Sequence, residues 1–366
     1  MIRIKDIIAE LESFAPLSLQ EDYDNCGLLT GKSDAEITAV LISLDCTEEV
    51  VEEAIQNKCG MIISHHPLVF GGLKHFTGST YVERTLIKAI KNDIAIYAAH
   101  TNMDNVQEGV NRMIAEKLGL KSCRILAPKN NLLRKLVTYV PPTQHQQVLD
   151  ALFLAGCGHI GNYDNCSFNT EGTGTFRGNE HSDPFLGKAG ELSREKEIRI
   201  ETIFESHQEA QILKALKSAH PYEEIAFDIY HLSNKFQSVG SGMTGEFEQG
   251  LNEEEFLHLV KKVLKCEFLK TTKKTGKLVK KVAFCGGSGR FLLKNAINSG
   301  SQAFITSDFK YHDYFDVDGK LLLVDAGHYE TEQYTSELFS RLLIKKFPTF
   351  AVRLSKINTN PVNYFK

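Results

Sequence analysis

Two adjacent histidines follow a short apolar run in this sequence. Met61–Ser64 has the composition of a buried strand, and His65 and His66 come directly after it. Ligands of α/β proteins bind outside the carboxyl ends of the strands, and neutral imidazoles are common ligands of divalent metals. The pair therefore indicates a metal site, although a His-His-Pro sequence also occurs as a structural or capping feature.

Two further segments repeat this arrangement. Asp104 follows the predicted strand Ile94–Ala99, and His328 and Glu332 follow the predicted strand Leu321–Asp325. His328 and Glu332 are four residues apart at the start of a helix, so they share one face of it. Each segment alone has a simpler explanation. The aspartate could be the N-cap of the next helix, and the His-Glu pair could be a surface contact.

Taken together, the segments favour metal binding over coincidence, because each follows a predicted strand. They offer a mixed nitrogen and oxygen ligand set: His65, His66, Asp104, His328 and Glu332. Carboxylates that can bridge suit a pair of ions about 3.5 to 4 Å apart, as in metal-assisted hydrolysis. Zn²⁺, Mn²⁺ and Fe²⁺ all accept such ligands, so the residue types predict one divalent ion or two adjacent ones without choosing among these metals.

Two more histidines lie close to these segments in the sequence. His100 precedes Asp104 by four residues, and His312 follows the predicted strand Ala303–Thr306. Each could act as a general acid or base, or could orient a ligand from outside. A buried, hydrogen-bonded structural histidine explains each of them equally well.

A glycine-rich turn follows the predicted strand Val282–Cys285. Gly286, Gly287, Ser288 and Gly289 would expose backbone N–H groups to an anion. The turn matches neither a Walker A loop nor a dinucleotide-binding fingerprint. Close packing of a helix against the sheet explains the glycines about as well.

Strands alternate with helices at both ends of the chain, which predicts an α/β fold with a mostly parallel sheet. The middle of the chain has the order strand, helix, strands, helix, strand, with a polar loop over 171–190; this is a ferredoxin-like α+β order. We therefore predict one discontinuous α/β domain from residues 1–127 and 241–366. An inserted ferredoxin-like domain would cover residues 128–240.

Composition limits the class of protein. A chain of 366 residues suggests two domains, and a net charge of -4 argues against non-specific nucleic-acid binding. No apolar run approaches the roughly 18 to 20 residues of a membrane span, and the first residues lead into an amphipathic stretch rather than a signal sequence. The 8 cysteines contain no CxxC pair. These features predict a cytoplasmic protein with reduced thiols and no membrane partner.

The site segments, in this order, resemble the type-2 GTP cyclohydrolase I homologue family, also called the NIF-three-like family. The matching stretches are Asp24–Leu28, Ser64–Pro67, His100–Asp104, Gly286–Gly289, Thr306–His312 and Gly327–Glu332. The resemblance implies two divalent ions held by the same five residues, and a toroidal homohexamer whose metal sites face an inner cavity. Two departures concern pocket shape: Tyr23 stands where the family often has Trp, and Glu108-Gly109 replaces Gly-Gly.

The middle module resembles the PII/CutA-like insert of longer family members. Gly172–Arg177, Asp183–Gly187 and His220–Glu224 carry this likeness. Pro221 enforces an extended backbone, so His220 is interpreted as structural rather than as a metal ligand.

Three functions remain open from the sequence. The first is a dinuclear metal-dependent hydrolase acting on GTP or another nucleotide-like small molecule. The second is a non-catalytic metal-binding scaffold or regulator whose insert senses a ligand or a partner. The third is a metal chaperone.

Overall fold

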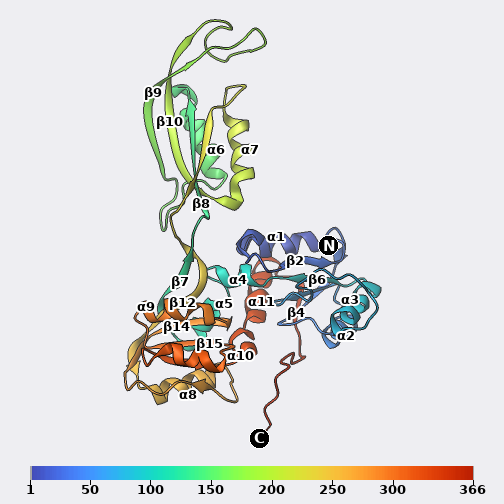
Figure 1. Ribbon diagram of the computed structural model, residues 1–366. Helices are drawn as coiled ribbons and strands as arrows, with labels where there is room; N and C mark the ends of the chain where they lie inside the picture. Colours follow the sequence, from blue (N-terminus) through green and yellow to red (C-terminus); the bar gives the residue numbers. More distant parts are fainter. Residues whose placement is uncertain (1, 366) are drawn as a thin grey trace. The chain divides into compact units, whose positions relative to one another are not determined.

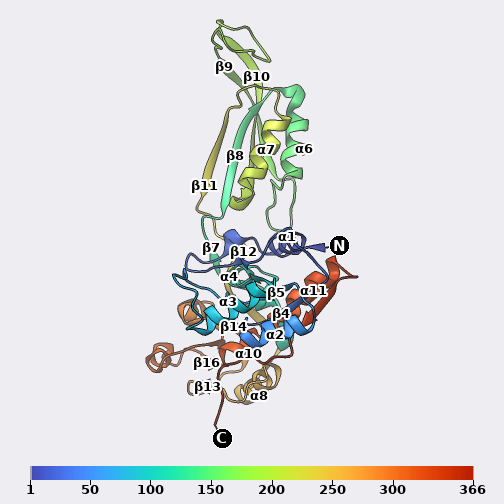
Figure 2. The ribbon, with the colours of Figure 1, turned by 90° about the vertical axis from the view of Figure 1, so that its right-hand side faces the viewer.

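The computed structural model describes residues 2–365 of the chain. The chain divides into two compact units. The larger is formed by the residues up to Pro128 together with those from Gln237 onward, and the smaller by Lys129–Phe236. Each unit has its own sheets and its own hydrophobic core (Figure 1, Figure 2).

The first sheet of the larger unit has five strands in the order β17-β4-β5-β6-β2. β17, β4, β5 and β6 are parallel neighbours, whereas β2 pairs antiparallel with β6. The strands are β2 (Gly27–Thr30), β4 (Ala39–Ser43), β5 (Met61–Ser64), β6 (Ala95–Ala98) and β17 (Ala351–Leu354).

The second sheet has six strands in the order β13-β16-β15-β14-β12-β7. Its centre is parallel, because β14, β15 and β16 run in the same direction, while β12 and β13 are antiparallel to their neighbours. The strands are β7 (Lys121–Lys129), β12 (Phe236–Leu251), β13 (Lys270–Thr271), β14 (Val279–Ser288), β15 (Ala303–Ser307) and β16 (Leu322–Asp325). A short antiparallel pair lies outside both sheets, β1 (Ile2–Arg3) with β3 (Glu36–Ile37).

Helices connect the strands of the larger unit. They are α1 (Ile4–Phe14), α2 (Glu48–Gln56), α3 (Tyr81–Lys91), α4 (Thr101–Asn105), α5 (Val110–Leu118), α8 (Glu253–Val263), α9 (Leu293–Asn298), α10 (His328–Glu332) and α11 (Thr335–Lys346), with 3-10 turns η1 (Leu17–Leu19), η4 (Arg290–Leu292) and η5 (Tyr311–Val317). None of the helices formed by residues 2–365 combines the length and the apolarity needed to cross a membrane.

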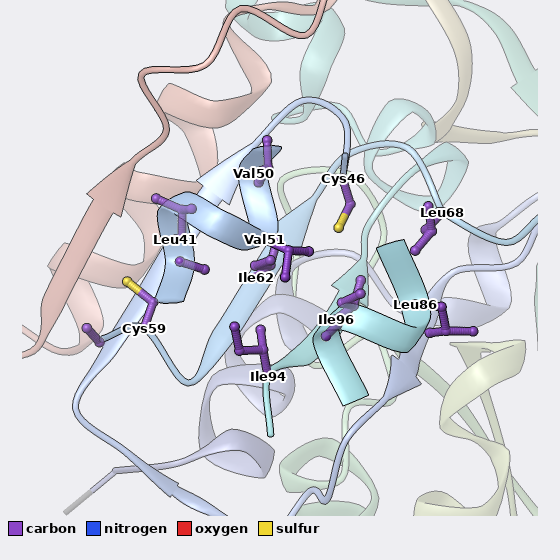
Figure 3. Close-up of a cluster of buried hydrophobic side chains, with 13 residues drawn as sticks. Leu41, Cys46, Val50, Val51, Cys59, Ile62, Leu68, Leu86, Ile94 and Ile96 are labelled. Atoms are coloured by element: carbon purple, nitrogen blue, oxygen red, sulfur yellow. The ribbon is translucent and has the colours of Figure 1, made fainter. Parts of the chain in front are cut away.

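Helices α2 and α3 pack on one face of the first sheet. Leu41 of β4, Ile62 of β5 and Ile96 of β6 form one buried cluster with Val51 of α2 and Leu86 of α3 (Figure 3). The intervening residues of these strands are also buried, and side chains alternate between the two faces of a strand. The sheet is therefore covered on both faces, which holds the ends of its strands in place.

The structure differs from the predicted fold in two respects that affect the site. The strands of the larger unit form two sheets rather than one. The strands β7 and β12, which the sequence pattern does not predict, extend the second sheet on the antiparallel side of β14. The helix expected to begin near Val106 is α5, which begins at Val110, and a further short helix, α4, precedes it. Asp104 lies inside α4, and Gly109 precedes α5, so Asp104 is not the N-cap of the next helix.

The smaller unit is one antiparallel sheet with two helices. Its strand order, β11-β8-β10-β9, is that of a ferredoxin-like fold. The elements are β8 (Leu133–Val140), η2 (Pro142–Gln144), α6 (His145–Leu154), β9 (Ser167–Phe176), β10 (Ser193–Glu205), η3 (Ser206–Gln208), α7 (Glu209–Ala219) and β11 (Phe227–Leu232). The predicted loop over 171–190 is wrong in its first part, because those polar and glycine residues of β9 pair with β10.

Glu83 of α3 organises the loop that precedes this helix. Its carboxylate accepts hydrogen bonds from the backbone N–H groups of Thr77, Gly78 and Ser79 at 2.8, 2.9 and 3.2 Å. Hydrogen bonds from Thr77 are the main cause that lowers the pKa of Glu83 to about 2. Its stabilising effect is therefore full above the ordinary value of 4.5 and is lost as the pH falls through about 2.

We expect Glu83→Gln to loosen this loop at neutral pH. The amide has one acceptor oxygen and no charge, so several of the N–H groups lose a charge-assisted hydrogen bond. Amide hydrogen exchange at residues 77–79 should become several-fold faster, while exchange in β5 stays unchanged. Glu52→Gln on α2 is the control, since Glu52 pairs with Lys88 on the surface. Equal exchange in both variants would contradict this role.

Candidate metal centre

The predicted site residues meet where parallel strands of the two sheets end. His65 and His66 follow β5, and Asp104 lies in α4 after β6. His328 and Glu332 form the ends of α10, which follows β16 of the second sheet. Because a parallel strand brings its carboxyl end to the same sheet edge as its neighbours, residues far apart in the sequence come together here.

Four imidazole rings form the centre of this cluster, and an oxygen atom is hydrogen-bonded to the Nδ1 atom of each. The partner is the carbonyl oxygen of Ala99 for His65 (2.9 Å) and a carboxylate for the other three. Asp45 contacts His66 at 2.7 Å, Asp24 contacts His100 at 2.9 Å, and Asp308 contacts His328 at 2.6 Å. Such partners fix the orientation of the ring and raise the basicity of the other nitrogen.

The Nε2 atoms face the carboxylates of the cluster. His66 Nε2 lies 2.9 Å from Glu332 Oε2, and His328 Nε2 lies 3.1 Å from the same oxygen. His65 Nε2 lies 3.6 Å from Asp104 Oδ1 and 3.8 Å from Glu332 Oε1. Three groups of side chains thereby offer ligand atoms within 4.8 Å of one another: His65-His66-His100, His66-His328-Glu332 and His65-Asp104-Glu332. These groups are able to hold a metal ion.

Several of these polar atoms are buried without a hydrogen bond. Among residues 2–365, His65 Nε2, Asp104 Oδ1 and Glu332 Oε2 have none that meets the usual geometric criteria. A buried polar atom without a partner costs about 1 to 3 kcal/mol, so unpaired atoms of this kind need an explanation. A cation bound between them would satisfy all three, and the donor set therefore fits a divalent metal.

The carboxylates and imidazoles change one another's ionisation. Burial and the charge of Glu332 raise the pKa of Asp104. Burial opposes the ionisation of Glu332, but its contacts with His328, His65 and His66 outweigh this and lower its pKa. Burial likewise opposes protonation of His66, yet Asp45 and Glu332 raise its pKa to about 10. Without a bound cation, a proton on His66 offsets the negative charge of the carboxylates, and metal uptake would release that proton.

Gly287 gives Glu332 the space it occupies. A Cβ atom on Gly287 would lie 2.2 Å from Glu332 Oε1 and 3.1 Å from His328 Nε2. Gly287 also has φ +58°, a conformation that glycine adopts without strain. The sequence left two explanations for this glycine, anion binding and close packing. The structure supports close packing, with Glu332 and His328 as the neighbours.

The glycine-rich segment is not the predicted turn, because β14 continues through Ser288, and it is poorly arranged to bind an anion. The N–H of Gly286 donates to Asn111 Oδ1 at 3.1 Å, and the N–H of Gly287 donates to Thr331 Oγ1 at 3.0 Å. Two of the four predicted donors are therefore already used inside the protein. Gly286 and Ser288 still line a cavity of about 210 Å³ beside the cluster. The helix that follows this segment, α9, has 6 residues.

The two additional histidines differ in position. His100 belongs to the cluster, with its ring centroid 5.1 Å from that of His65 and 5.2 Å from that of His66. His312 is exposed in η5, where its ring contacts Tyr311 and Phe315. It belongs to none of the three ligand groups.

Sequence reasoning missed the residues that orient the imidazoles. Asp45 appears in the sequence only as the end of a predicted strand, Asp24 as part of a turn, and Asp308 as part of a segment after a strand. Burial opposes the ionisation of Asp24, but hydrogen bonds from His100 and Thr101 hold its pKa well below the usual range. The sequence position of two of these aspartates could have indicated a role in the site, because Asp45 follows β4 and Asp308 follows β15.

Two cavities open onto the cluster. One of about 210 Å³ is lined by His66, His100, Asp104, His328 and Glu332, with Phe70 at 5.8 Å from the His100 ring. The other, of about 410 Å³, lies on the side of His66 and His328 and is lined by aromatic rings, Lys270 and the C-terminal segment. The candidate metal site is therefore accessible to small molecules.

We expect Asp308→Asn to weaken binding of one ion by about 10- to 100-fold, the usual effect of losing an outer partner of a histidine ligand. Asn has the same size and tolerates the left-handed backbone of Asp308 (φ +63°). Asp318→Asn is a matched control, since Asp318 is exposed with φ +50°. Calorimetric titration of Zn²⁺ or Mn²⁺ would measure the effect, and equal affinities in both variants would contradict it.

An α/β protein with a split core domain, an inserted ferredoxin-like unit and a cluster of side chains able to hold a metal ion is the class that this fold and site define. The profile of the Duf34/NIF3 (NGG1p interacting factor 3) family matches residues 2–361. The chain therefore belongs to the Duf34/NIF3 family, as its motifs indicate.

Known relatives span the whole chain. A protein of Halalkalibacterium halodurans named GTP cyclohydrolase 1 type 2 homolog is 39% identical over 364 residues, covering 98% of each chain. A Bacillus subtilis protein of the same name is 37% identical, with the same coverage. The solved structure of a Bacillus cereus protein related to NIF3 is 37% identical, with a TM-score of 0.86 over 100% of this chain and 99% of that one.

A more distant likeness concerns the fold alone. Reduced HcgD from Methanocaldococcus jannaschii is 21% identical, with a TM-score of 0.58 over 97% of this chain and 98% of that one. The α/β fold of the family therefore extends to proteins of low sequence identity.

Proposed function

We propose that this protein is a hydrolase that uses two divalent ions to act on GTP or another nucleotide-like small molecule. The observation that carries the proposal is that two of the ligand groups share Glu332, one with His65 and Asp104 and the other with His66 and His328. A carboxylate with two oxygens can serve two neighbouring ions. The name of the relatives, GTP cyclohydrolase 1 type 2 homolog, supplies the substrate to test first.

Bound divalent ions would supply Lewis acidity and a hydroxide nucleophile at neutral pH. The side chains of the protein would orient the ligands and provide a group that carries a proton. Asp45 and Asp308 keep the Nδ1 atoms of their histidines occupied, so that Nε2 remains the ligand atom. Asp24 holds His100 in the same way beside the cluster, where the ring can carry a proton to or from a substrate.

The cavity of about 410 Å³ offers a surface for a planar substrate. Phe268 and Tyr364 lie with ring centroids 5.2 Å apart and provide aromatic surface at its edge. Lys270 lies on the same cavity, where its ammonium group is 3.7 Å from the carboxylate of Asp325. Opening the imidazole ring of guanine would release formate, which gives a direct assay for the cyclohydrolase reaction.

The test is elemental analysis of the purified full chain, with formate release from GTP measured on the same sample. We expect about two ions per chain and turnover that depends on them. His100→Gln should keep both ions and lose turnover if His100 carries a proton; loss of an ion would make it a ligand. Absence of metal after reconstitution with Zn²⁺, Mn²⁺ and Fe²⁺ would overturn the proposal. Bound metal without formate release would exclude GTP cyclohydrolysis and leave other substrates.

We also propose, from the family resemblance, that the protein assembles as a homohexamer and that the smaller unit is PII/CutA-like. Sedimentation measurements test the first of these. Deletion of 129–236 addresses the alternative of a regulator with a sensing insert. Turnover that survives while a binding function is lost would make the insert regulatory.

A further inference from the structure

The smaller unit contains a cavity of about 520 Å³ that the proposed hydrolase does not use. Its wall brings together the three segments that carry the likeness of the insert: the end of β9, the loop after it, and the residues that follow α7. All of the lining residues belong to the smaller unit. The volume lies within the range of small-molecule sites, about 300 to 1,000 Å³.

Three aromatic rings form one part of the wall. The ring centroid of Tyr222 is 6.4 Å from that of Phe176 and 6.3 Å from that of Phe185. The ring planes are tilted by 53° and 49°, so the rings do not stack flat on one another. Uncovered aromatic faces attract cations, and groups of such rings are a common site for organic ammonium ions.

Tyr222 is held in place by two other side chains. The N–H of Tyr222 donates to His220 Nδ1 at 3.2 Å, and His220 Nε2 donates to the carbonyl oxygen of Tyr139 at 2.9 Å. This arrangement requires a neutral His220, and burial lowers its pKa accordingly. The hydroxyl of Tyr222 donates to Glu197 Oε1 at 2.9 Å. The wall is therefore fixed by its own hydrogen bonds, and His220 has a structural role.

The charges on the cavity favour a cation. Glu197, Glu223 and Glu224 line it, and Arg177 is the one basic side chain among its lining residues. Glu197 Oε2 lies against Gly174, where a Cβ atom would be 2.0 Å away, so the absence of a side chain there leaves room for this carboxylate. An anionic ligand would meet three carboxylates and one guanidinium.

We propose that this cavity binds a small organic ammonium ion, with the charge against Glu197 and the alkyl groups against the aromatic rings. The proposal does not depend on the metal site or on hydrolysis. It gives the insert a ligand of its own, apart from the substrate of the larger unit.

The test is titration of the full chain, by calorimetry or ligand-observed NMR, with choline and with butylamine. The uncharged counterparts of similar shape are 3,3-dimethylbutanol for choline and butanol for butylamine. We expect at least one amine to bind about tenfold or more tightly than its counterpart. Glu197→Gln, which keeps the acceptor for Tyr222, should weaken amine binding by about tenfold. Glu171→Gln is the control, because Glu171 is an exposed carboxylate of β9 outside the cavity.

Phe185→Ala provides an independent variant, since this half-exposed ring (50%) can be removed without opening the core. It should weaken amine binding in a chain with unchanged thermal stability. Equal binding of amines and alcohols would overturn the proposal, as would equal losses in Glu197→Gln and Glu171→Gln. Failure of both amines to bind would also overturn it, including the case in which a second copy of the chain fills the cavity.

Discussion

Replacement of Glu332 by Gln is expected to weaken binding of both ions of the proposed dinuclear site by about a hundredfold or more. Glu332 is 3% exposed and belongs to two of the three ligand groups, so both would lose the same charged ligand. An outer partner of a ligand is worth about 10- to 100-fold in affinity, and a shared ligand should exceed this. Gln has nearly the same shape, so the change removes charge rather than volume.

Elemental analysis and Zn²⁺ or Mn²⁺ titration would measure this effect. Glu337→Gln is the matched control, because Glu337 lies nearby in the sequence on α11 and pairs at the surface with Lys117 at 2.8 Å. Such a surface pair contributes about 0 to 1 kcal/mol, so this variant should fold and bind metal normally. Loss of only one ion in Glu332→Gln would show that Glu332 is not shared between two ions. Retention of both would remove it from the ligand set.

Substitution of Gly287 by Ala is expected to displace Glu332 and to reduce metal affinity by about 10- to 100-fold. The added methyl group would lie 2.2 Å from Glu332 Oε1, far inside van der Waals contact, and that side chain is buried and cannot move freely. The effect reaches the site through space, since the methyl group is not itself a ligand. A misplaced ligand costs affinity much as a lost outer partner does.

Gly319→Ala separates this clash from the cost of the backbone conformation. Gly319 has φ +65°, close to the +58° of Gly287, but nothing lies within 4 Å of the position that its added methyl group would take. Both variants should lose about 1 kcal/mol of stability from the left-handed backbone. Only Gly287→Ala should lose metal. Equal metal content in the two variants would contradict the packing argument.

Much of the metal centre could be predicted from the sequence because its residues lie at positions with a simple structural meaning. His65 and His66 follow a four-residue apolar run, and His328 and Glu332 have the spacing of one helical turn. Strand ends in a parallel sheet share an edge, so the pattern alone indicates that these side chains approach one another. Their clustering is what the structure shows, and metal binding itself is left to experiment.

Other parts could not be predicted, because they depend on contacts between distant segments. Apart from Phe168 and Phe176, the strand β9 consists of polar residues and glycines, and its pairing with β10 rather than its own pattern makes it a strand. His312 has the same sequence context as the other histidines, yet η5 leaves it exposed. Asp104 has the spacing of a helix cap, and only the break between α4 and α5 shows that it is not one.

The sequence by itself indicated the family through the resemblance of its motifs. It also determined the α/β class, the inserted unit and the five candidate ligands, because these follow from local periodicity and from residue types at fixed spacing. Only the tertiary structure decided how the ligands are grouped, since Glu332 joins two groups across two different sheets. It also decided which aspartates orient the histidines and why Gly287 must lack a side chain. These features depend on contacts between segments that are far apart in the sequence; His66 and His328, for example, are separated by 262 residues. No local pattern encodes such contacts.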